Sequence, residues 1–279
     1  MEGVPVAQTD QFWIASTGKQ FVSAAILNLS DNGALRLDEP VSRFFPDAPS
    51  DKAAITIRQL LSHTSGFTQS YVAEEFTTRE AAAPAMLNEP LDGAPGEKFR
   101  YSNLNYQIAA AIVEIASGEN YRAFVAGRLW KPAGLKSTGF STPETASRVS
   151  AISTILPPRL TRITWDDQGV YSSAEDLFRW YRALRSGKIL TDQALAEMFS
   201  PAISISEGRA ALGWFIDHSP KGAERIFTRG NEDFGANSLV YAYPATDSVI
   251  IVLTHAGDAN AQTSWSRLVH RELEALLGL

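Results

Sequence analysis

The chain has 279 residues, of which 44% are hydrophobic and 20% are charged, and its formal net charge is −6. This length suits one large domain or two small ones, and an acidic balance without any basic run argues against nucleic acid as a partner. The sequence contains no cysteine, which excludes disulfides, thiolate metal sites and a cysteine nucleophile.

The first two thirds of the chain are predicted to be mainly helical. Apolar residues recur at helical spacing from Phe21 to Leu29, and Gly33 is placed to end this helix in the left-handed conformation. A connection rich in proline and charge follows, and Thr56 is suited to cap a short helix that runs to His63. Further helices are predicted over residues 105–116, ended by Gly118, over 120–134, closed by Pro132 and Gly134, and over 172–187, with a serine cap.

The last quarter of the chain changes character. Residues 211–217, 224–230, 237–244 and 248–255 are short, β-branched and aromatic segments separated by turn residues, and they are predicted to be antiparallel strands. An amphipathic helix is predicted over residues 264–279. Helices in the middle and a sheet at the end indicate an α+β plan with segregated parts.

The stretch "FWIASTGKQF" places Ser16 three positions before Lys19, where a helix is about to begin. Residues three apart share a helix face, with Cβ atoms about 5–6 Å apart, so the amine can reach the hydroxyl. A serine nucleophile needs a base, and burial together with the positive end of the helix disfavours the charged form of the lysine. Because the first N–H groups of the helix can also stabilise an oxyanion, this one helix start could hold a nucleophile, a base and half an oxyanion hole.

A second motif, "PGEKFRYSNLNY", contains Tyr101 and Asn103 directly before a strong helix. A phenol beside a lysine can shuttle a proton, and an asparagine amide can hold a substrate carbonyl. Both motifs have a structural alternative, because short motifs occur by chance. Ser16 could be an N-cap with Lys19 in solvent, and Tyr101 could be a turn tyrosine with Asn103 or Asn105 as the helix cap.

Five segments, taken in order, resemble the serine β-lactamase-like, penicillin-recognising hydrolases: "FWIASTGKQF", "LRLDEPVSRFFPD", "ITIRQLLSHTSGF", "PGEKFRYSNLNYQIAAAIVEIASG" and "LWKPAGLKSTGF". This family includes class C β-lactamases, D-alanyl-D-alanine carboxypeptidases, D-aminopeptidases and related esterases. The resemblance extends to "GVYSSAEDLFRW" and to the final strands. It implies a β-lactamase/transpeptidase-like α+β fold, with an antiparallel sheet flanked by helices and a mostly helical region.

The resemblance also implies roles for the residues of both motifs. Ser16 would be the acylated nucleophile, and Lys19 and Tyr101 would share the general base and acid work. Asn103 would bind the carbonyl or amide side chain of the substrate. The oxyanion donors would be the backbone N–H of Ser16 and one N–H on the strand that carries the family's third motif. His63 matches a loop histidine that is interpreted as structural.

The third motif departs from the usual Lys-Thr-Gly or His-x-Gly, because the region here reads "IFTRGNEDFGANS". Either residues 228–230 take its place, or Arg229 replaces the lysine or histidine, counted back from Gly235. Arg229, Gly230 and Asn231 are therefore predicted to bind substrate. A guanidinium is a poor proton shuttle but binds carboxylates in a fork, so Arg229 is expected to recognise a substrate anion or to hold Tyr101 as a phenolate. The alternative is a strand-end arginine paired with a nearby acid, Glu232 or Asp233.

Relatives carry a helix and two strands before the nucleophile, whereas only 15 residues precede Ser16 here. The resemblance therefore predicts a sheet that lacks these N-terminal strands and exposes an edge or an apolar face. The expected organisation is a lead-in over residues 1–15, a mostly helical region over 16–150 and an α/β region over 151–279. The catalytic cleft is expected between the last two regions.

The predicted function is a serine hydrolase that forms an acyl-enzyme on an ester, amide, D-peptide or β-lactam carbonyl, with esterase or peptidase-like activity favoured. The alternative is a non-catalytic binding or scaffold protein that keeps the fold. No metal or organic cofactor is implied, because none of the four histidines has metal-ligand spacing. Residues 68–98 and 141–168 are expected to set specificity, and Trp165 and Trp214 to line an acyl pocket.

No stretch reaches the roughly 18 continuous apolar residues of a membrane span, and residues 1–10 do not resemble a secretory signal. A signal removed by processing would leave no trace, so a cytoplasmic location and a processed, periplasmic or secreted one both fit. The expected partner is a small-molecule substrate. For the incomplete sheet three alternatives stay open: the sequence is truncated, another chain fills the gap, or a second copy covers it.

Overall fold

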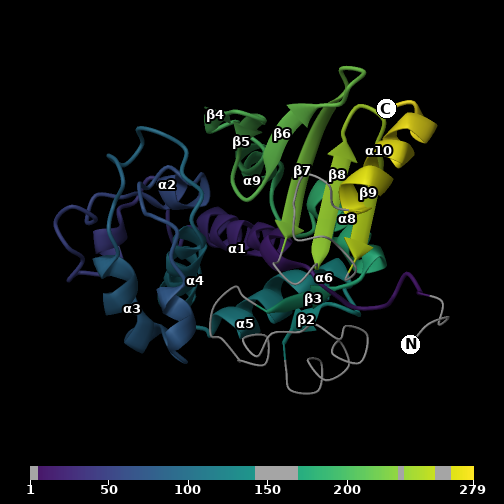
Figure 1. Ribbon diagram of the computed structural model, residues 1–279. Helices are drawn as coiled ribbons and strands as arrows, with labels where there is room; N and C mark the ends of the chain where they lie inside the picture. Colours follow the sequence, from purple (N-terminus) through teal and green to yellow (C-terminus); the bar gives the residue numbers. More distant parts are fainter. Residues whose placement is uncertain (1–5, 142–168, 232–235, 255–264) are drawn as a thin grey trace.

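The computed structural model describes residues 6–141, 169–231, 236–254 and 265–279 (Figure 1). Its main sheet has six antiparallel strands in the order β4-β5-β6-β7-β8-β9, so each strand pairs with its neighbours along the chain. They are β4 (Ile203–Ile205), β5 (Gly208–Ala210), β6 (Phe215–His218), β7 (Glu224–Asn231), β8 (Asn237–Tyr243) and β9 (Ser248–Thr254). The last four correspond to the four predicted strands, and β9 is the end strand in the described part of the chain.

Helices α8 and α10 pack on the sheet, and α2, α3 and α4 form a separate layer beside it (Figure 1). They are α1 (Lys19–Asp31), α2 (Ile57–Leu61), α3 (Arg79–Asn88), α4 (Asn103–Ser117), α5 (Tyr121–Phe124), α6 (Lys131–Ala133), α8 (Ala174–Arg185), α9 (Asp192–Met198) and α10 (Trp265–Leu277). Short 3-10 helices are η1 (Ala15–Gly18), η2 (Val41–Arg43) and η3 (Val72–Glu75), and η4 (Val125–Trp130) is a π-helical turn. None of the helices that the structure describes has the length and apolar character to span a bilayer.

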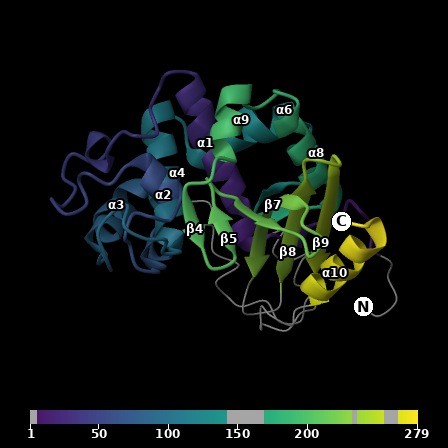
Figure 2. The same cartoon turned by 90° about the horizontal axis from the view of Figure 1, so that it is seen from above.

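Helix α1 runs through the middle of the molecule, between the sheet and the layer formed by α2, α3 and α4 (Figures 1 and 2). It is buried along most of its length because its apolar side chains pack against α4 on one side and α9 on the other. Asn32 caps its C-terminus and Gly33 follows with φ of 72°, which is the left-handed ending that the sequence predicts. At its other end, α1 is preceded by η1, which packs against β7 of the sheet.

The two faces of the sheet bury different side chains, as the alternation along β8 requires. Val240 and Ala242 face the main core, which includes residues of α1 and α8. Leu239, Tyr241 and Tyr243 face the opposite way, into a smaller cluster beneath α10. The sheet is thus covered by helices on both faces.

A second, smaller sheet was not predicted from the sequence. It joins β1 (Phe12–Trp13), β3 (Val170–Ser172) and β2 (Gly139–Phe140) in the order β1-β3-β2. Strands of two or three residues are too short to show an alternating pattern, which is why the lead-in to Ser16 did not indicate one. The hairpin of β4 and β5 escaped prediction for the same reason.

Two helix predictions need correction. Residues 120–134 do not form one regular helix, because α5 passes through the π-helical turn η4 into α6. Pro132 lies in the first turn of α6, where its missing N–H costs little, and only Gly134, with φ of 77°, ends the helix. In addition, residues 68–98, for which no helix was predicted, contain α3, and the sequence concealed this helix because Pro84 lies inside it.

A buried charge network holds α10 to the sheet. Arg225 on β7 donates from Nε and Nη2 to Asp217 at 2.5 and 2.8 Å and from Nη1 to Glu274 of α10 at 2.5 Å. Burial opposes the charged form of Arg225, but the two carboxylates more than offset this and raise its pKa. Tyr243 also donates to Glu274, at 2.6 Å, and contacts the ring of His270.

The stability of the protein is expected to fall as the pH drops from about 6.5 towards about 4, in part because of His270. Burial lowers the pKa of His270 to about 4, so in this window the unfolded chain binds a proton that the folded chain does not. Urea denaturation of His270→Phe, which keeps a ring against Tyr241, should show a smaller loss of unfolding free energy between pH 7 and 5 than the wild type. The exposed His218→Phe should keep the wild-type slope, and an equal slope in all three proteins would contradict the expectation.

Candidate active site

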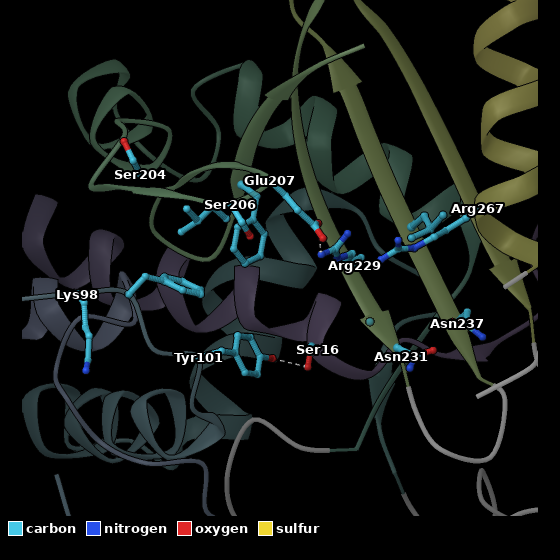
Figure 3. A pocket seen from close by; sticks show the side chains of 15 residues that line it. Ser16, Lys98, Tyr101, Ser204, Ser206, Glu207, Arg229, Asn231, Asn237 and Arg267 are labelled. Carbon is cyan, nitrogen blue, oxygen red and sulfur yellow. Dashed lines mark hydrogen bonds and ion pairs between the residues drawn. The ribbon is translucent and has the colours of Figure 1, made fainter. Parts of the chain in front are cut away.

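Ser16 lies in η1, one turn before α1 begins. Ala15, directly before it, has φ of 47°, a left-handed conformation that a non-glycine residue adopts at a cost of order 1–3 kcal/mol. Neither η1 nor α1 is capped by a serine side chain, since Ile14 and Gly18 occupy the N-cap positions. Ser16 is therefore not an N-cap. Its half-buried hydroxyl faces Lys19 of α1 and Tyr101 of the loop before α4. Figure 3 shows the contact with Tyr101.

Two predicted site residues, Lys19 and Tyr101, contact the hydroxyl of Ser16, and a third, Asn103, contacts Lys19. Lys19 donates from Nζ to Ser16 Oγ at 3.2 Å and to Asn103 Oδ1 at 2.8 Å. Tyr101 donates from its phenol to Ser16 Oγ at 2.7 Å (Figure 3). Lys19 is only 5% exposed, so its amine lies in a largely water-free environment between the hydroxyl and the amide. This is the geometry that the spacing of Ser16 and Lys19 predicts.

The loop that carries Tyr101 is fixed by hydrogen bonds from its neighbours. The backbone N–H of Ser102 donates to Nδ1 of His63 at 3.2 Å, and its hydroxyl donates to the carbonyl of Thr68 at 2.7 Å. The N–H of Asn103, the first residue of α4, donates to Gln69 Oε1 at 2.8 Å. Asn103 thus begins α4 without capping it, and its side chain is left to contact Lys19.

The ring of His63 packs against the ring of Tyr101. Its ring lies 4.4 Å from the phenol ring, centroid to centroid, with 30° between the planes. Burial, followed by the nearby charge of Lys19, holds the pKa of His63 well below its usual value, so the imidazole is neutral and its Nδ1 can accept from Ser102. His63 makes no contact with Ser16 that the structure records, which agrees with its interpretation as a structural residue.

The strand with the altered third motif lies directly beside η1. Strand β6 pairs with β7 only as far as Phe227, whereas β8 continues the pairing to Asn231. The other edge of residues 228–231 is therefore left to pack against η1. Thr228, Arg229 and Gly230 follow one another along this edge, and the alternative register counted from Gly235 lies outside the described residues.

Gly230 is the point of closest approach between β7 and η1. A Cβ atom on it would lie 2.2 Å from the carbonyl oxygen of Ile14, 2.7 Å from Ser238 Oγ and 2.9 Å from the Cβ of Ala15. The nearest of these atoms is backbone and cannot rotate away. Only glycine therefore lets the strand reach the turn that carries Ser16.

Gly230→Ala is expected to lower both stability and any activity that depends on Ser16, because β7 and η1 must separate to admit the methyl group. The expected cost is about 1–3 kcal/mol of unfolding free energy, measured by chemical denaturation, together with a lower labelling rate at Ser16. Gly139→Ala on β2 is the control, since nothing lies within 4 Å of its Cβ position. An equal, small effect of both changes would contradict the close-approach role.

A cavity of about 730 Å³ opens beside Ser16 (Figure 3). Tyr101 and Phe99 line it from the helical side, and residues of β7 and β8 line it from the sheet. All three predicted binding residues of β7 contribute, with Gly230 buried and Asn231 exposed at the end of the strand. The turn of the β4–β5 hairpin closes one side through residues 204–207.

Arg229 forms an ion pair that the sequence did not predict. Its Nη2 donates to Glu207 Oε2 of the hairpin turn at 2.6 Å, and this hydrogen bond lowers the pKa of the Glu207 carboxyl. The predicted acidic neighbours, Glu232 and Asp233, lie outside the described residues. The structure records no contact between Arg229 and Tyr101 in the part of the chain that it describes, so the phenolate-holding role is unsupported by a direct bond.

The chain matches one known protein family over nearly its whole length. The family model described as Beta-lactamase matches residues 1–271. The chain belongs to the beta-lactamase family. The predicted resemblance is thereby confirmed.

Individual relatives of this beta-lactamase family member are distant. Protein flp of Staphylococcus aureus (strain MW2) is 28% identical over 273 residues, which cover 90% of this chain and 54% of flp. The chain spans about half the length of the curated relatives it matches.

Solved structures establish the fold. An octameric penicillin-binding protein homologue from Pyrococcus abyssi aligns with a TM-score of 0.83 at 23% identity, covering 99% of this chain and 68% of the homologue. The D-amino acid amidase from Ochrobactrum anthropi SV3 aligns with a TM-score of 0.81 at 24% identity, covering 99% of this chain and 88% of the amidase. The predicted β-lactamase/transpeptidase-like α+β fold is confirmed.

Sequence reasoning missed two charged residues of this beta-lactamase-like site. Glu207 lies in the turn between β4 and β5, two strands of three residues each, and Arg267 lies in the first turn of α10. Both side chains line the cavity beside Ser16 (Figure 3). No local signal distinguishes either of them from an ordinary surface charge, since only the folded chain brings them together.

The remaining predictions concern tryptophans and metals. Trp214 is buried, packs edge to face on Phe199 and lines a small recess beneath Lys19 rather than the main cavity. Trp165 lies outside the described residues, as does most of the predicted specificity loop over 141–168. Within the described segments, no group of three or more His, Cys, Asp or Glu side chains is placed to hold a metal ion.

Proposed function

We propose that the chain is a serine hydrolase that works through an acyl-enzyme. The observation that carries the proposal is the hydroxyl of Ser16, which accepts hydrogen bonds from Lys19 Nζ and the Tyr101 phenol at the wall of a cavity large enough for a small substrate. A structural serine has no need of two titratable partners. Such an arrangement is suited to activating a nucleophile.

In the proposed reaction, Ser16 Oγ attacks the carbonyl carbon of an amide or ester while its proton passes to the Lys19–Tyr101 pair, one member of which must be deprotonated. The pair then returns a proton to the leaving amine or alcohol as its bond to the carbonyl carbon breaks. A water molecule attacks the resulting ester on Ser16, gives one proton to the pair and releases the acid. The pair finally restores the proton to Ser16.

The negative oxygen of the tetrahedral intermediate needs hydrogen-bond donors on both sides. The N–H of Ser16, at the start of η1, is one candidate, because the first N–H groups of a helix lack partners within it. The second is a backbone N–H from residues 229–231, on the edge of β7 that packs against η1. The contact at Gly230 sets the distance between these donors.

The first substrates to test are amides of D-amino acids and D-peptides. Homologous structures include a penicillin-binding protein homologue and a D-amino acid amidase, the latter also in complex with D-phenylalanine. In this chain Phe99 and Phe215 line the cavity with their rings edge to face, 6.3 Å apart, which gives an apolar wall for a hydrophobic side chain. Esters and β-lactams share the reacting carbonyl and are secondary candidates.

Covalent labelling tests the proposal directly. A fluorescent β-lactam and a fluorescent phosphonate are each incubated with the wild type and with Tyr101→Phe, and adducts are located by mass spectrometry. The wild type is expected to label at Ser16, and Tyr101→Phe about 10²-fold or more slowly, because the phenol no longer takes part in proton transfer. Failure of both probes to label Ser16 would favour the non-catalytic binding protein.

Self-association is a separate proposal. Among the described strands, β9 pairs only with β8, so its outer edge is available to a second copy or another chain. The Pyrococcus abyssi homologue is octameric.

A further inference from the structure

His63 contacts the loop of Tyr101 at three points. Its carbonyl oxygen accepts a hydrogen bond from the N–H of Arg100 at 2.7 Å, and its Nδ1 accepts one from the N–H of Ser102 at 3.2 Å. Its ring packs on the phenol ring between these two residues, 4.4 Å away from centroid to centroid. His63 therefore holds the chain on both sides of Tyr101, whose hydroxyl donates to Ser16 Oγ at 2.7 Å (Figure 3).

The backbone of His63 has a conformation in which glycine is usual. At the end of α2 the N–H of His63 donates to the carbonyl of Leu60 at 3.1 Å. The N–H of Thr64 donates to the carbonyl of Gln59 at 2.8 Å, which completes a Schellman motif and places His63 at its left-handed position, with φ of 56°. Glycine occupies such a position at no steric cost, and asparagine also occurs there. A histidine carries backbone strain here, which indicates a role for its side chain.

Hydrogen bonds fix the tautomer of the imidazole. Because a backbone N–H can only donate, Nδ1 of His63 carries no proton where it accepts from Ser102. Asn105 Nδ2 lies 3.2 Å from the same Nδ1 and donates to it, since Asn105 Oδ1 accepts from the hydroxyl of Ser65 at 2.5 Å. All four residues are buried, and burial, followed by the charge of Lys19, holds the pKa of His63 well below its usual value. The imidazole is therefore a neutral acceptor.

His63 is placed to act through Tyr101 rather than on a substrate. Among the residues that the structure describes, it lines the smaller recess and not the cavity proposed to hold the substrate. The rings of Tyr101, Tyr106 and Phe99 lie around it, at centroid distances of 4.4, 5.0 and 5.7 Å. A misplacement of about 1 Å at a reacting group can lower a rate about 10²-fold, so the support of the phenol bears on the chemical step.

We propose that His63 is a positioning residue for Tyr101: its neutral imidazole accepts from the N–H of Ser102 and supports the phenol ring, so that the phenol stays within hydrogen-bond distance of Ser16 Oγ. The proposal rests on the proposed function, because it concerns the proton transfer to and from Ser16. It adds a residue that touches neither the nucleophile nor the substrate, and it accounts for a histidine at a position that favours glycine.

The test compares two substitutions that both suit the left-handed turn. His63→Gly relieves the strain but removes the imidazole, whereas the Oδ1 of His63→Asn can lie near the position of Nδ1 and accept from Ser102. The fluorescent phosphonate is used over a range of concentrations, which separates its affinity from the maximal labelling rate constant. His63→Gly should lower this rate constant about 10-fold to 10²-fold without changing the affinity, and His63→Asn should restore most of the lost rate.

Ser62→Ala is the matched control. Ser62 directly precedes His63, is buried and bonds through its hydroxyl to the carbonyl of Arg58 and to Thr64 Oγ1, at 2.8 and 2.9 Å. It should leave the labelling rate constant unchanged, because these bonds lie within the turn and do not reach Tyr101. Thermal melts of each variant establish that it is folded.

A double-mutant cycle shows whether His63 acts through the phenol. In a Tyr101→Phe background, His63→Gly should cause no further loss of labelling rate, because the group that it positions is already absent. Amide hydrogen exchange at Ser102, measured by NMR, adds a readout that does not depend on the reactivity of Ser16. This exchange should be faster in His63→Gly than in the wild type and in His63→Asn, because the N–H has lost its acceptor.

A wild-type labelling rate in folded His63→Gly would overturn the proposal, as would a rate in His63→Asn no better than in His63→Gly. A loss of equal size with and without the Tyr101 phenol would also overturn it, because His63 would then act by another route. These results would leave the acyl-enzyme function standing. A wild type that is not labelled at Ser16, with the expected exchange at Ser102, would instead overturn the hydrolase function and keep His63 as the residue that holds the Tyr101 loop.

Discussion

Replacing Ser16 by alanine is expected to lower kcat by about 10⁴-fold or more on any ester or amide that the wild type hydrolyses. Lys19 and Tyr101 keep their positions in this variant, because Lys19 remains hydrogen-bonded to Asn103 and the loop of Tyr101 is held by His63, Thr68 and Gln69. The loss would therefore report the missing nucleophile rather than a collapsed site. Initial rates with p-nitrophenyl esters and D-amino acid p-nitroanilides give the measurement.

Ser206→Ala is the matched control for this experiment. Ser206 lines the same cavity but lies on the exposed turn of the β4–β5 hairpin, away from Ser16 and Tyr101 (Figure 3). Its removal is expected to change kcat less than about threefold. Residual activity of Ser16→Ala within tenfold of the wild type would show that another group attacks the substrate.

Replacing Arg225 by leucine is expected to reduce the unfolding free energy by about 3–5 kcal/mol, because it leaves the carboxylates of Asp217 and Glu274 buried without their cation. The side chains concerned are 14%, 18% and 4% exposed, for Arg225, Asp217 and Glu274 respectively. Solvent therefore cannot compensate for the lost charge. Urea denaturation at pH 7, with the slope compared between variants, provides the measurement.

Arg209→Leu separates burial from charge. Arg209 pairs with Glu224 at 3.0 Å on the same sheet, but the two side chains are 38% and 54% exposed. Such a surface pair contributes less than about 1 kcal/mol. If both leucine variants were destabilised equally, the network beneath α10 would not be what holds this helix.

The sequence allowed the contact between Ser16 and Lys19 to be predicted because it is local. Ser16 and Lys19 are three residues apart at a helix start, and that spacing alone brings their side chains within reach. The position of Tyr101 beside them followed from the family resemblance, since nothing near Tyr101 indicates a contact 85 residues away. The long helices and the four strands β6 to β9 were predictable because each presents a full period of its hydrophobic pattern.

The features that escaped prediction are short or non-local. Strands β1, β2 and β3 have two or three residues each, too few for a pattern, and Pro84 masked α3. The ion pair of Arg229 with Glu207 spans 22 residues and depends on where a hairpin turn folds. The place of Arg267 in the cavity depends on how α10 packs on the sheet, which amphipathic periodicity does not specify.

The contact at Gly230 has a consequence for how the protein loses activity. The turn that carries Ser16 is bonded to the sheet through Ser238, whose hydroxyl donates to the Ile14 carbonyl at 2.6 Å and lies within hydrogen-bond distance of Thr17 Oγ1, at 2.8 Å. The same turn leads directly into α1. Ser16 is therefore held both by the sheet and by α1, and we expect it to lie in the most slowly opening part of the structure. Amide hydrogen exchange at Thr17 should track global unfolding, and heat inactivation should coincide with denaturation rather than precede it.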